Sequence, residues 1–376
     1  MTRRVIILLI VCMFLCACGK EKSVQLVEDE KSVVEKVEGN SFSAENEEEQ
    51  KENNVTKEDI DEANAENLEN LFPHPLTGEL LKEEYAGSIA AITINNCQDA
   101  LPQYGISQAD VLYEIETEGG ITRMLAIFTD LENVESIGPV RSTRTFFNNL
   151  AAAYNAPFFH CGGNIHALGG AYDMYGNVVS GWKHIDQTQN EKYFFRDTDR
   201  YYYQDYAWEH TLFTTGEGIL NALEDKGYNN EERLNFGLNF LDSDVLVGEN
   251  ADEVEITFAG GKTYTMTYNV GAGLYEGAEY GEKHIDAATG KVMTYRNVLV
   301  LFTSQYKGEK DLSYYDLIGS GEGYYACDGT IIPIQWSRES VDEPFRYNKE
   351  NGQDLLLGVG NSYIAIVSNV GSVEYN

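Results

Sequence analysis

The chain has 376 residues, 43% of them hydrophobic, and a formal net charge of −34 at pH 7. This acidity argues against nucleic acid and anionic lipid surfaces as general partners, because both carry charge of the same sign. The part of the chain after residue 70 is long enough for two ordinary hydrophobic cores.

Residues 1–18 have the features of a targeting segment. Arg3 and Arg4 precede an apolar run, residues 5–15, that is too short to span a bilayer as a mature helix. The sequence L-C-A-C that ends at Cys18, followed by Gly19, resembles a bacterial lipobox, which implies that Cys18 carries lipid. We therefore expect a lipid anchor on the extracytoplasmic face of the cell membrane, with a plain secretory signal as the alternative.

Residues 19–70 are predicted to be a disordered acidic tether. Glu, Lys, Asn and Ser dominate this stretch, which has almost no aromatic residues. A segment of this composition cannot bury enough apolar surface to offset the entropy that it would lose on ordering.

Residues 71–244 predict an α/β layered domain that ends in a helical connector. Strands are expected at 89–95, 111–117, 121–129 and about 157–161, with Gly119-Gly120 as a hairpin turn between the second and third. Helices are expected directly after Arg144, at 166–174, and at 219–224 with Thr214 or Thr215 as the N-cap. In such layers ligands collect at the carboxyl ends of the strands.

Residues 245–376 predict a β-rich domain, either a sandwich or a barrel. The sequences V-E-I-T-F at 254–258 and Y-T-M-T-Y at 264–268 alternate on either side of an A-G-G-K turn. Asp328-Gly329 and Asn351-Gly352 are further hairpin turns. The fold class of the whole chain is therefore expected to be α+β.

Three arginines lie close together in a chain that otherwise has few. E-G-G-I-T-R ends at Arg123, and I-G-P-V-R-S-T-R contains Arg141 and Arg144 just before a predicted helix, with Ser142 and Thr143 as good N-cap types. A helix N-terminus favours an anion, and a guanidinium binds phosphate or carboxylate with two parallel hydrogen bonds. This pattern predicts an anion-binding site in a crevice of the α/β layer.

The alternative is that these arginines pair with nearby carboxylates and only hold the fold together. Glu114, Glu116, Glu118 and Asp130 are the candidates, and the sequence does not separate the two interpretations. Arginines that converge without partners would favour binding. The other candidate ligand-binding residues are Ser142, Glu118, His160, Asn164 and His210, and Arg141 is expected to lie near Asn164.

His284 and Asp286 form a secondary candidate in the sequence K-H-I-D-A-A-T-G. Residues two apart in a strand share a face, so the two side chains could form an acid–base pair or half of a metal site. The D-x-x-T-G pattern also suits an ordinary polar turn, which we favour.

The stretch at 193–208 is dense in aromatic residues and follows neither helical nor strand spacing. It could form an aromatic wall that binds a sugar or peptide, because rings stack on apolar faces while hydroxyl groups bind polar ones. It could equally be an ordered loop packed on the core.

Several motifs resemble a known family. I-N-N at 94–96, G-I-S-Q-A-D-V-L-Y-E at 105–114, the two arginine motifs and H-C-G-G-N at 160–164 are similar to those of the YerB-like family of predicted lipoproteins. The resemblance implies an N-terminal domain of unknown function followed by a C-terminal partner domain, also of unknown function. It implies no established activity.

Whether the protein is an enzyme stays open. No Walker loop, zincin helix, dinucleotide fingerprint or serine elbow is found, so no cofactor and no metal site are expected. One hypothesis is a lipoprotein that binds an anionic envelope ligand or a protein partner. The other is an envelope phosphotransferase or hydrolase acting on a phosphorylated or wall-polymer substrate, by analogy with the LytR-CpsA-Psr enzymes, with Asp110 or Asp130 holding a metal near the arginines.

Overall fold

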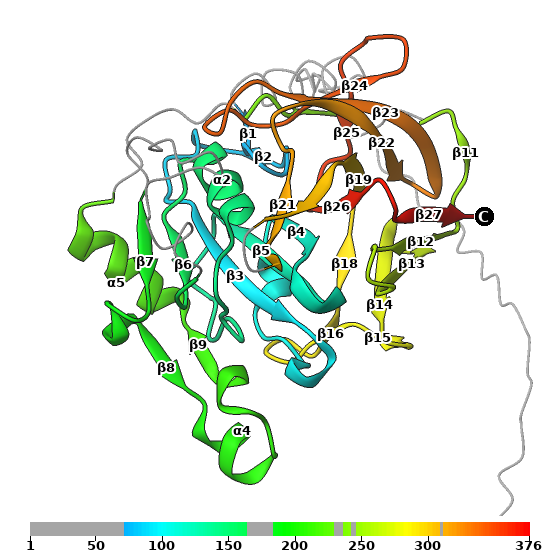
Figure 1. The fold of residues 1–376 in the computed structure, drawn as a ribbon. Coiled ribbons are helices and arrows are strands. Elements are labelled where there is room, and N and C mark those ends of the chain that lie inside the picture. Colours follow the sequence, from blue (N-terminus) through cyan, green and yellow to red (C-terminus); the bar gives the residue numbers. More distant parts are fainter. Residues whose placement is uncertain (1–70, 164–182, 229–235, 242–245, 309–310) are drawn as a thin grey trace, which may run out of the picture. The chain divides into compact units, whose positions relative to one another are not determined.

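The computed structural model describes residues 71–163, 183–228, 236–241, 246–308 and 311–376 (Figure 1). The expected targeting segment with Cys18, the tether, Asn164 and the helix expected at 166–174 lie outside these residues. No helix in the described ranges combines the length and apolar character needed to cross a bilayer.

One large sheet runs through most of the described chain. Its described strands are ordered β11-β23-β22-β19-β26-β4-β5-β3-β6-β7, with β24 paired to β23 at the side. In chain order their bounds are β3 (Ala90–Asn96), β4 (Val111–Glu116), β5 (Thr122–Phe128), β6 (Phe158–His160), β7 (His184–Asp186), β11 (Glu249–Asn250), β19 (Asn297–Thr303), β22 (Gly319–Cys327), β23 (Thr330–Arg338), β24 (Arg346–Lys349) and β26 (Ser362–Ser368).

This sheet joins the two halves of the chain. β26, from the C-terminal half, pairs in parallel with β4 from the N-terminal half, with Ser362 opposite Val111. β4, β3, β6 and β7 run in the same direction, and β5 is antiparallel between β4 and β3. The carboxyl ends of the parallel strands therefore meet at one edge of the sheet.

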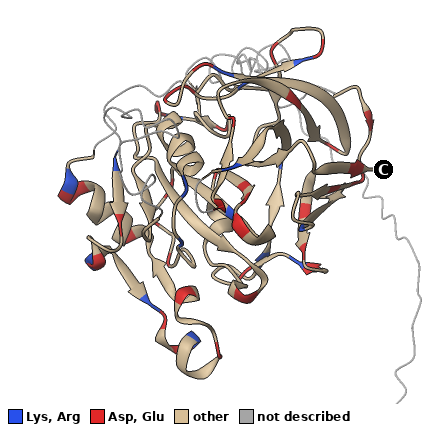
Figure 2. Ribbon diagram, viewed as in Figure 1, with Lys and Arg blue, Asp and Glu red and all other residues tan. Residues whose placement is uncertain are grey.

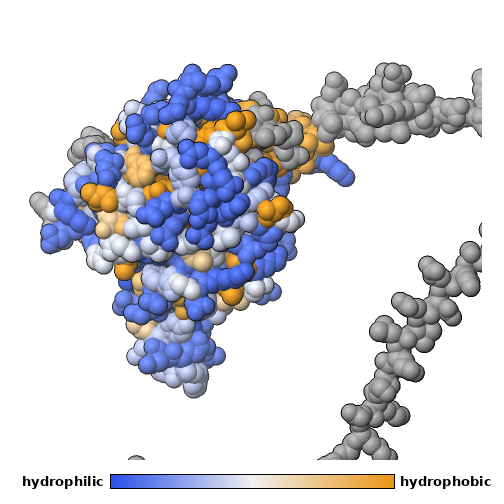
Figure 3. All heavy atoms as spheres, turned by 90° about the vertical axis from the view of Figure 1, so that its right-hand side faces the viewer, coloured by the Kyte–Doolittle hydropathy of each residue, from blue (hydrophilic) through white to orange (hydrophobic). Residues whose placement is uncertain are grey.

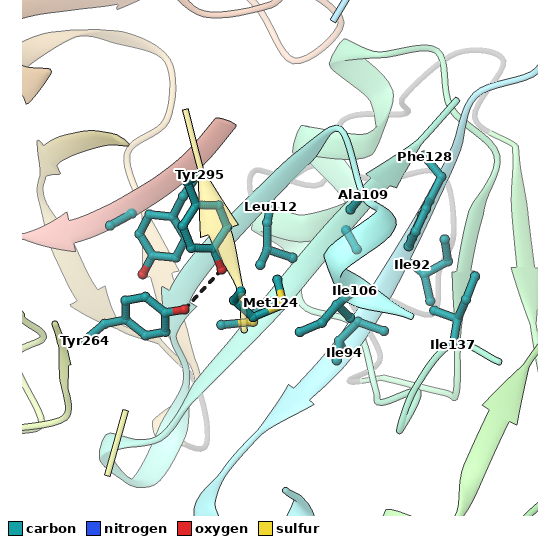
Figure 4. Packing of buried hydrophobic residues seen from close by; sticks show 14 of the residues in the cluster. Ile92, Ile94, Ile106, Ala109, Leu112, Met124, Phe128, Ile137, Tyr264 and Tyr295 are labelled. Atoms are coloured by element: carbon teal, nitrogen blue, oxygen red, sulfur yellow. Dashed lines mark hydrogen bonds between the residues drawn. The ribbon is translucent and has the colours of Figure 1, made fainter. Parts of the chain in front are cut away.

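Two hydrophobic cores cover the two faces of the sheet. Alternate residues of β3 and β5 point to opposite faces, so Ile92 and Met124 contribute to one core, and Leu125 and Ile127 to the other. Figure 4 shows the first core, where the Tyr264 and Tyr295 hydroxyls are hydrogen-bonded at 3.1 Å. Helix α2 (Thr145–Ala153) adds its buried side to the second core. Burial on both faces explains the nearly continuous apolar runs in these strands.

The C-terminal half is β-rich, as predicted, and has a second sheet of its own. Among the described residues it contains β12 (Glu253–Thr257), β13 (Thr263–Asn269), β14 (Leu274–Glu279), β15 (Glu282–Lys283), β18 (Thr294–Tyr295) and β27 (Ser372–Tyr375). The predicted β12–β13 hairpin is confirmed. The Asp328-Gly329 turn joins β22 to β23, with positive φ angles of 52° and 70° that suit this pair of residues.

An arm extends from the large sheet beside helix α5 (Figure 1). It comprises η4 (Glu191–Tyr193), β8 (Phe194–Arg196), α4 (Thr198–Tyr203), η5 (Trp208–His210) and β9 (Leu212–Thr214). The predicted connector helix is α5 (Gly216–Lys226), whose N-cap Thr215 accepts a hydrogen bond from the Gly218 amide at 2.8 Å.

Short elements complete the described chain. The strands are β1 (Phe72–Pro73), β2 (Leu80–Leu81), β10 (Asn239–Phe240), β16 (Ile285–Asp286), β17 (Lys291–Val292), β20 (Gln305–Lys307), β21 (Ser313–Tyr315) and β25 (Leu356–Leu357). The 3-10 turns are η1 (Gln98–Ala100), η2 (Ile106–Gln108) and η3 (Glu118–Gly120), of which η3 makes the predicted turn between β4 and β5.

Candidate functional site

The segment between β5 and α2 fills a gap between two diverging strands. β3 and β6 pair directly only through Ala91 and Ile92. Beyond them the Arg141 amide donates to the Thr93 carbonyl at 3.0 Å, and the Cys161 amide donates to the Arg141 carbonyl at 3.1 Å. Arg141 is therefore held like a strand residue at the carboxyl-terminal edge of the sheet.

Arg123 is a buried cation without a carboxylate partner among the described residues. It is the second residue of β5 and only 6% exposed. Nη1 donates to the Ser142 carbonyl at 2.6 Å, and Nε has no hydrogen-bond partner in the described chain. Burial, then Arg144 and Arg141, lowers the pKa of Arg123 to about 9. The positive charge here is poorly compensated.

Arg141 has a weak carboxylate contact. Nη2 lies 3.4 Å from Glu209 Oε1, and the Glu209 side chain is 57% exposed. Nε is buried and has no hydrogen-bond partner in the described ranges. Because an exposed pair of this length contributes little, Glu209 does not neutralise Arg141.

Arg144, in contrast, pairs with a carboxylate, as the alternative interpretation of the arginines predicts. Its Nε and Nη2 donate to Glu118 Oε2 at 2.9 and 2.6 Å, and Nη1 donates to the Thr143 carbonyl at 2.7 Å. Burial opposes ionisation of Glu118, but the hydrogen bonds from Arg144 and the Ser313 amide hold its pKa below the usual range. The predicted N-cap is wrong, because Arg144 itself occupies that position without a side-chain cap, and the Thr143 hydroxyl donates to Asn148.

The two candidate histidines have different surroundings. His210 is buried near Arg141, and its Nδ1 accepts a hydrogen bond from the side-chain Nδ2 of Asn95 at 2.9 Å. Burial and Arg141 lower the pKa of His210. His160, at the end of β6, instead contacts His184 of β7 at 3.3 Å, and burial lowers its pKa to about 4. Both are neutral near pH 7.

A buried ion-pair network that the sequence did not predict lies on the other face of this edge. Lys262 Nζ donates to Glu114 Oε1 at 2.5 Å and to Glu279 Oε2 at 2.7 Å, and all three side chains are almost fully buried. Glu114 also accepts from Asn96 and Thr122. A glutamate within an apolar strand signals a buried partner, but nothing near it in the sequence identifies Lys262.

Comparison with known proteins shows the family. Residues 76–229 match the N-terminal domain, and residues 254–364 the C-terminal domain, of the proteins of unknown function named DUF3048. The chain belongs to this family.

Two comparisons agree with this assignment. A relative named "Putative lipoprotein YerB", from Bacillus subtilis (strain 168), is 27% identical over 273 residues, which cover 70% of this chain and 77% of the relative. The crystal structure of the YerB protein from Bacillus subtilis has a TM-score of 0.68 and 26% identity, and the match covers 81% of this chain and 99% of that chain.

In this DUF3048 chain His284 and Asp286 serve separate contacts. His284 Nδ1 and Nε2 lie 2.8 Å from the Tyr264 hydroxyl and 2.9 Å from Gln103 Oε1. The Asp286 carboxylate accepts from the Gly105 and Ser107 amides, both at 2.8 Å. No hydrogen bond joins the two side chains within the described residues, so they do not form the acid–base pair that was the alternative to a polar turn. Asp286 instead ties the β16–β17 turn to the N-terminal half, as a polar turn residue can.

The two aspartates considered as metal ligands lie at the wrong edge of the sheet. Asp110 precedes β4 and accepts from the Thr129 amide and hydroxyl at 2.7 and 2.6 Å, whereas the arginines lie at the other end of β4. A six-residue strand spans roughly 20 Å. Asp130 follows β5, which is antiparallel, so it lies at the same end as Asp110. No described group of three or more His, Cys, Asp or Glu side chains could hold a metal ion.

Proposed function

We propose that this chain is a lipid-anchored lipoprotein on the extracytoplasmic face of the cell membrane, and that it binds an anionic envelope ligand through Arg123 and Arg141. The lipobox-like sequence ending at Cys18 and the printed name of the relative support the anchor. The anchor would leave the folded part free to meet ligands of the cell envelope.

The observation that carries the binding proposal is that Arg123 is buried without a carboxylate partner among the described residues. Removing a guanidinium from water costs several kcal/mol unless a counter-charge replaces the lost hydration. Arg144 has such a counter-charge in Glu118, but among the described residues Arg123 donates only to a neutral carbonyl oxygen. An anion bound beside Arg123 and Arg141 would supply the missing charge.

The chemistry of the site points to a compact anion such as a phosphate or carboxylate group. Arg141 is 24% exposed at its side chain, so a ligand can reach it from solvent, and Nε of both arginines lacks a partner in the described chain. Guanidinium groups bind the oxygen atoms of these anions with parallel, charge-assisted hydrogen bonds. The Arg144–Glu118 pair ties the loop that carries Arg141 to the β4–β5 turn.

The test is a thermal-shift titration of residues 19–376, without the lipid, against phosphate, pyrophosphate and a short-chain phosphatidic acid. A ligand that binds only the folded state stabilises it by mass action and so raises the melting temperature. At a ligand concentration of a hundred times Kd, the stabilisation is about 2.7 kcal/mol. Arg141→Ala should abolish most of this shift. Arg346→Ala, at an exposed position of β24, is the matched control and should keep it.

Arg123→Lys is a second variant. It keeps the buried positive charge but removes the planar guanidinium that binds an anion with two parallel hydrogen bonds. It should weaken the phosphate-dependent shift while the protein still folds. No shift with any of the three anions, or equal shifts in the wild type and Arg141→Ala, would show that the arginines serve only the fold.

A further inference from the structure

The arm concentrates exposed aromatic side chains that the anion site does not use. Large aromatic residues are usually well buried, and a group of exposed ones marks an interaction site more often than a single one does. On the face shown in Figure 3 the arm, at the bottom, is coloured neutral to hydrophilic, because tyrosine is mildly hydrophilic on this scale. Its exposed rings are Phe195 (42%), Tyr201 (43%), Tyr202 (69%), Tyr203 (83%) and Trp208 (48%).

The arm is fixed to the rest of the fold. Arg200 is 1% exposed and donates to the carbonyl groups of Ala100 and Pro102 at 2.9 and 3.2 Å. The Tyr206 hydroxyl donates to the Leu101 carbonyl at 2.7 Å, and the Arg200 guanidinium lies 4.0 Å from the centre of the Tyr206 ring. The backbone that carries the exposed rings is therefore anchored before any ligand arrives, which lowers the entropy cost of binding.

A cleft of about 470 Å³ opens at the base of the arm. Its volume lies within the usual range for small-ligand sites. It combines flat aromatic walls with side chains that donate and accept hydrogen bonds. Its lining residues are Gln187, Glu191, Phe194, Phe195, Arg196, Trp208 and Leu212.

Arg196 is oriented by Trp208 and has N–H donors that are not used in the described chain. Its Nη1 donates to the Trp208 carbonyl at 2.7 Å, and its guanidinium lies 4.8 Å from the centre of the Trp208 ring. In the part of the chain that the structure describes, no carboxylate pairs with Arg196, and its Nε and Nη2 make no hydrogen bond. The cleft thus presents a fixed guanidinium fork, the Glu191 carboxylate and the Gln187 amide around apolar ring faces.

We propose that this cleft binds a sugar ring of an envelope glycan. A pyranose has an apolar C–H face, which stacks on an aromatic ring, and a rim of hydroxyl groups, each of which donates and accepts hydrogen bonds. Phe195 and Trp208 supply the rings. Arg196 donates, Glu191 accepts, and Gln187 does both.

The charge of the arm argues against a membrane surface as the occupant. Glu191, Asp199, Asp205 and Glu209 are exposed, whereas Lys192 is the exposed cation of the described stretch 191–212. Figure 2 marks the positions of acidic and basic residues along the ribbon of the arm. Anionic headgroups attract basic segments, so an acidic rim disfavours them but leaves neutral hydroxyl groups unaffected.

The cleft adjoins Arg141 but does not depend on anion binding there. Trp208 directly precedes Glu209, which contacts Arg141. The Cys161 amide donates to the Arg141 carbonyl, and the Cys161 thiol donates to Gln187 Oε1 at 3.4 Å. The inference goes beyond the proposed function, since a neutral sugar could bind if Arg141 bound nothing. If both sites act, a glycan that carries an anionic group could reach both.

The test is isothermal titration calorimetry of residues 19–376 with three neutral probes, cellotetraose, maltotetraose and the tetramer of N-acetylglucosamine. At least one should bind. Trp208→Ala should weaken that binding by about tenfold, the usual scale of an aromatic contact, and Trp208→Phe should retain most of it. Tyr203→Ala removes an exposed ring of the same arm outside the cleft, so it is the matched control and should bind as the wild type does.

Three results would overturn the proposal. They are no heat of binding with any of the three probes, equal affinity in Trp208→Ala and the wild type, or a Trp208-dependent attachment to phosphatidylglycerol vesicles without sugar binding. Phe195→Ala repeats the test from the other wall if Trp208→Ala fails to fold. Arg141→Ala separates the two sites, because it should abolish the phosphate response and leave sugar binding unchanged.

Discussion

Two buried cations at the edge of the large sheet, Lys262 and Arg123, differ in the charged groups that surround them. Lys262 contacts Thr122, and Arg123 is the next residue, so the two cations lie on opposite faces of β5. Burial opposes the charge of Lys262, but Glu114 and Glu279 outweigh it and hold its pKa above the usual value. Burial lowers the pKa of Arg123, and its arginine neighbours lower it further. Lys262 is therefore a structural cation, and Arg123 has the surroundings of a binding cation.

Lys262→Met should strongly destabilise the protein. The substitution leaves Glu114 and Glu279 buried without their shared counter-ion, which costs about 3 to 5 kcal/mol. Urea unfolding followed by circular dichroism measures the loss. The matched control is Lys283→Met, because Lys283 makes a surface pair with Glu276 and its side chain is 64% exposed, so its loss should change stability by about 0.5 kcal/mol or less. Similar losses in both variants would refute the structural role of Lys262.

At the scale of elements, two turns from distant parts of the chain hold each other. The β4–β5 turn contains Gly120, and the β12–β13 turn contains Gly260, whose amide donates to Glu116 Oε2 at 2.5 Å. A Cβ atom on Gly260 would lie 2.3 Å from the Gly120 Cα atom. Only a residue without a side chain allows this approach, which sets the position of Lys262 two residues later.

Gly260→Ala should therefore destabilise the protein by about 1 to 3 kcal/mol, because the two backbones must separate. Gly271→Ala is the control, since a Cβ atom there would meet only the Asn269 side chain at 3.4 Å. Urea midpoints of the two variants test the contact. Equal midpoints would show that the turns can part without cost.

At the scale of the molecule, burial of histidines makes stability depend on pH. Burial lowers the pKa of all five histidines that the structure describes, which are His74, His160, His184, His210 and His284. The unfolded chain, with pKa values of about 6.5, then binds more protons than the folded chain. This contribution to stability is fully present above the unfolded pKa and is lost as pH falls toward the folded values.

The urea midpoint is therefore expected to fall between about pH 7.5 and about pH 5. Asp110 acts in the opposite direction, because burial raises its pKa to about 6, so its carboxyl group favours folding more at lower pH. Asp110→Asn removes this opposing effect and should show a steeper decline. A midpoint that stays constant or rises on acidification would contradict the prediction.

Local pattern was sufficient for several of the longer elements of this fold. The apolar runs of β3, β4 and β5, the glycine turn between the last two, helices α2 and α5, and the β12–β13 hairpin follow from residue spacing and turn chemistry. The sequence also identified Arg123, Arg141 and His210 as candidates before their positions were known. Each of these signals lies within a few residues, where backbone geometry dominates.

The roles of the charged residues depended on contacts between distant segments. Arg144 pairs with Glu118, whereas Arg123 pairs with no carboxylate in the part of the chain that the structure describes, although the sequence motifs do not distinguish the two arginines. Lys262 meets Glu114 across 148 residues of chain. Sequence by itself determined several of the longer elements, the family motifs and the set of arginines. Tertiary structure alone decided which of the arginines pair closely with a carboxylate, because the cost of a buried charge depends on which groups surround it in space.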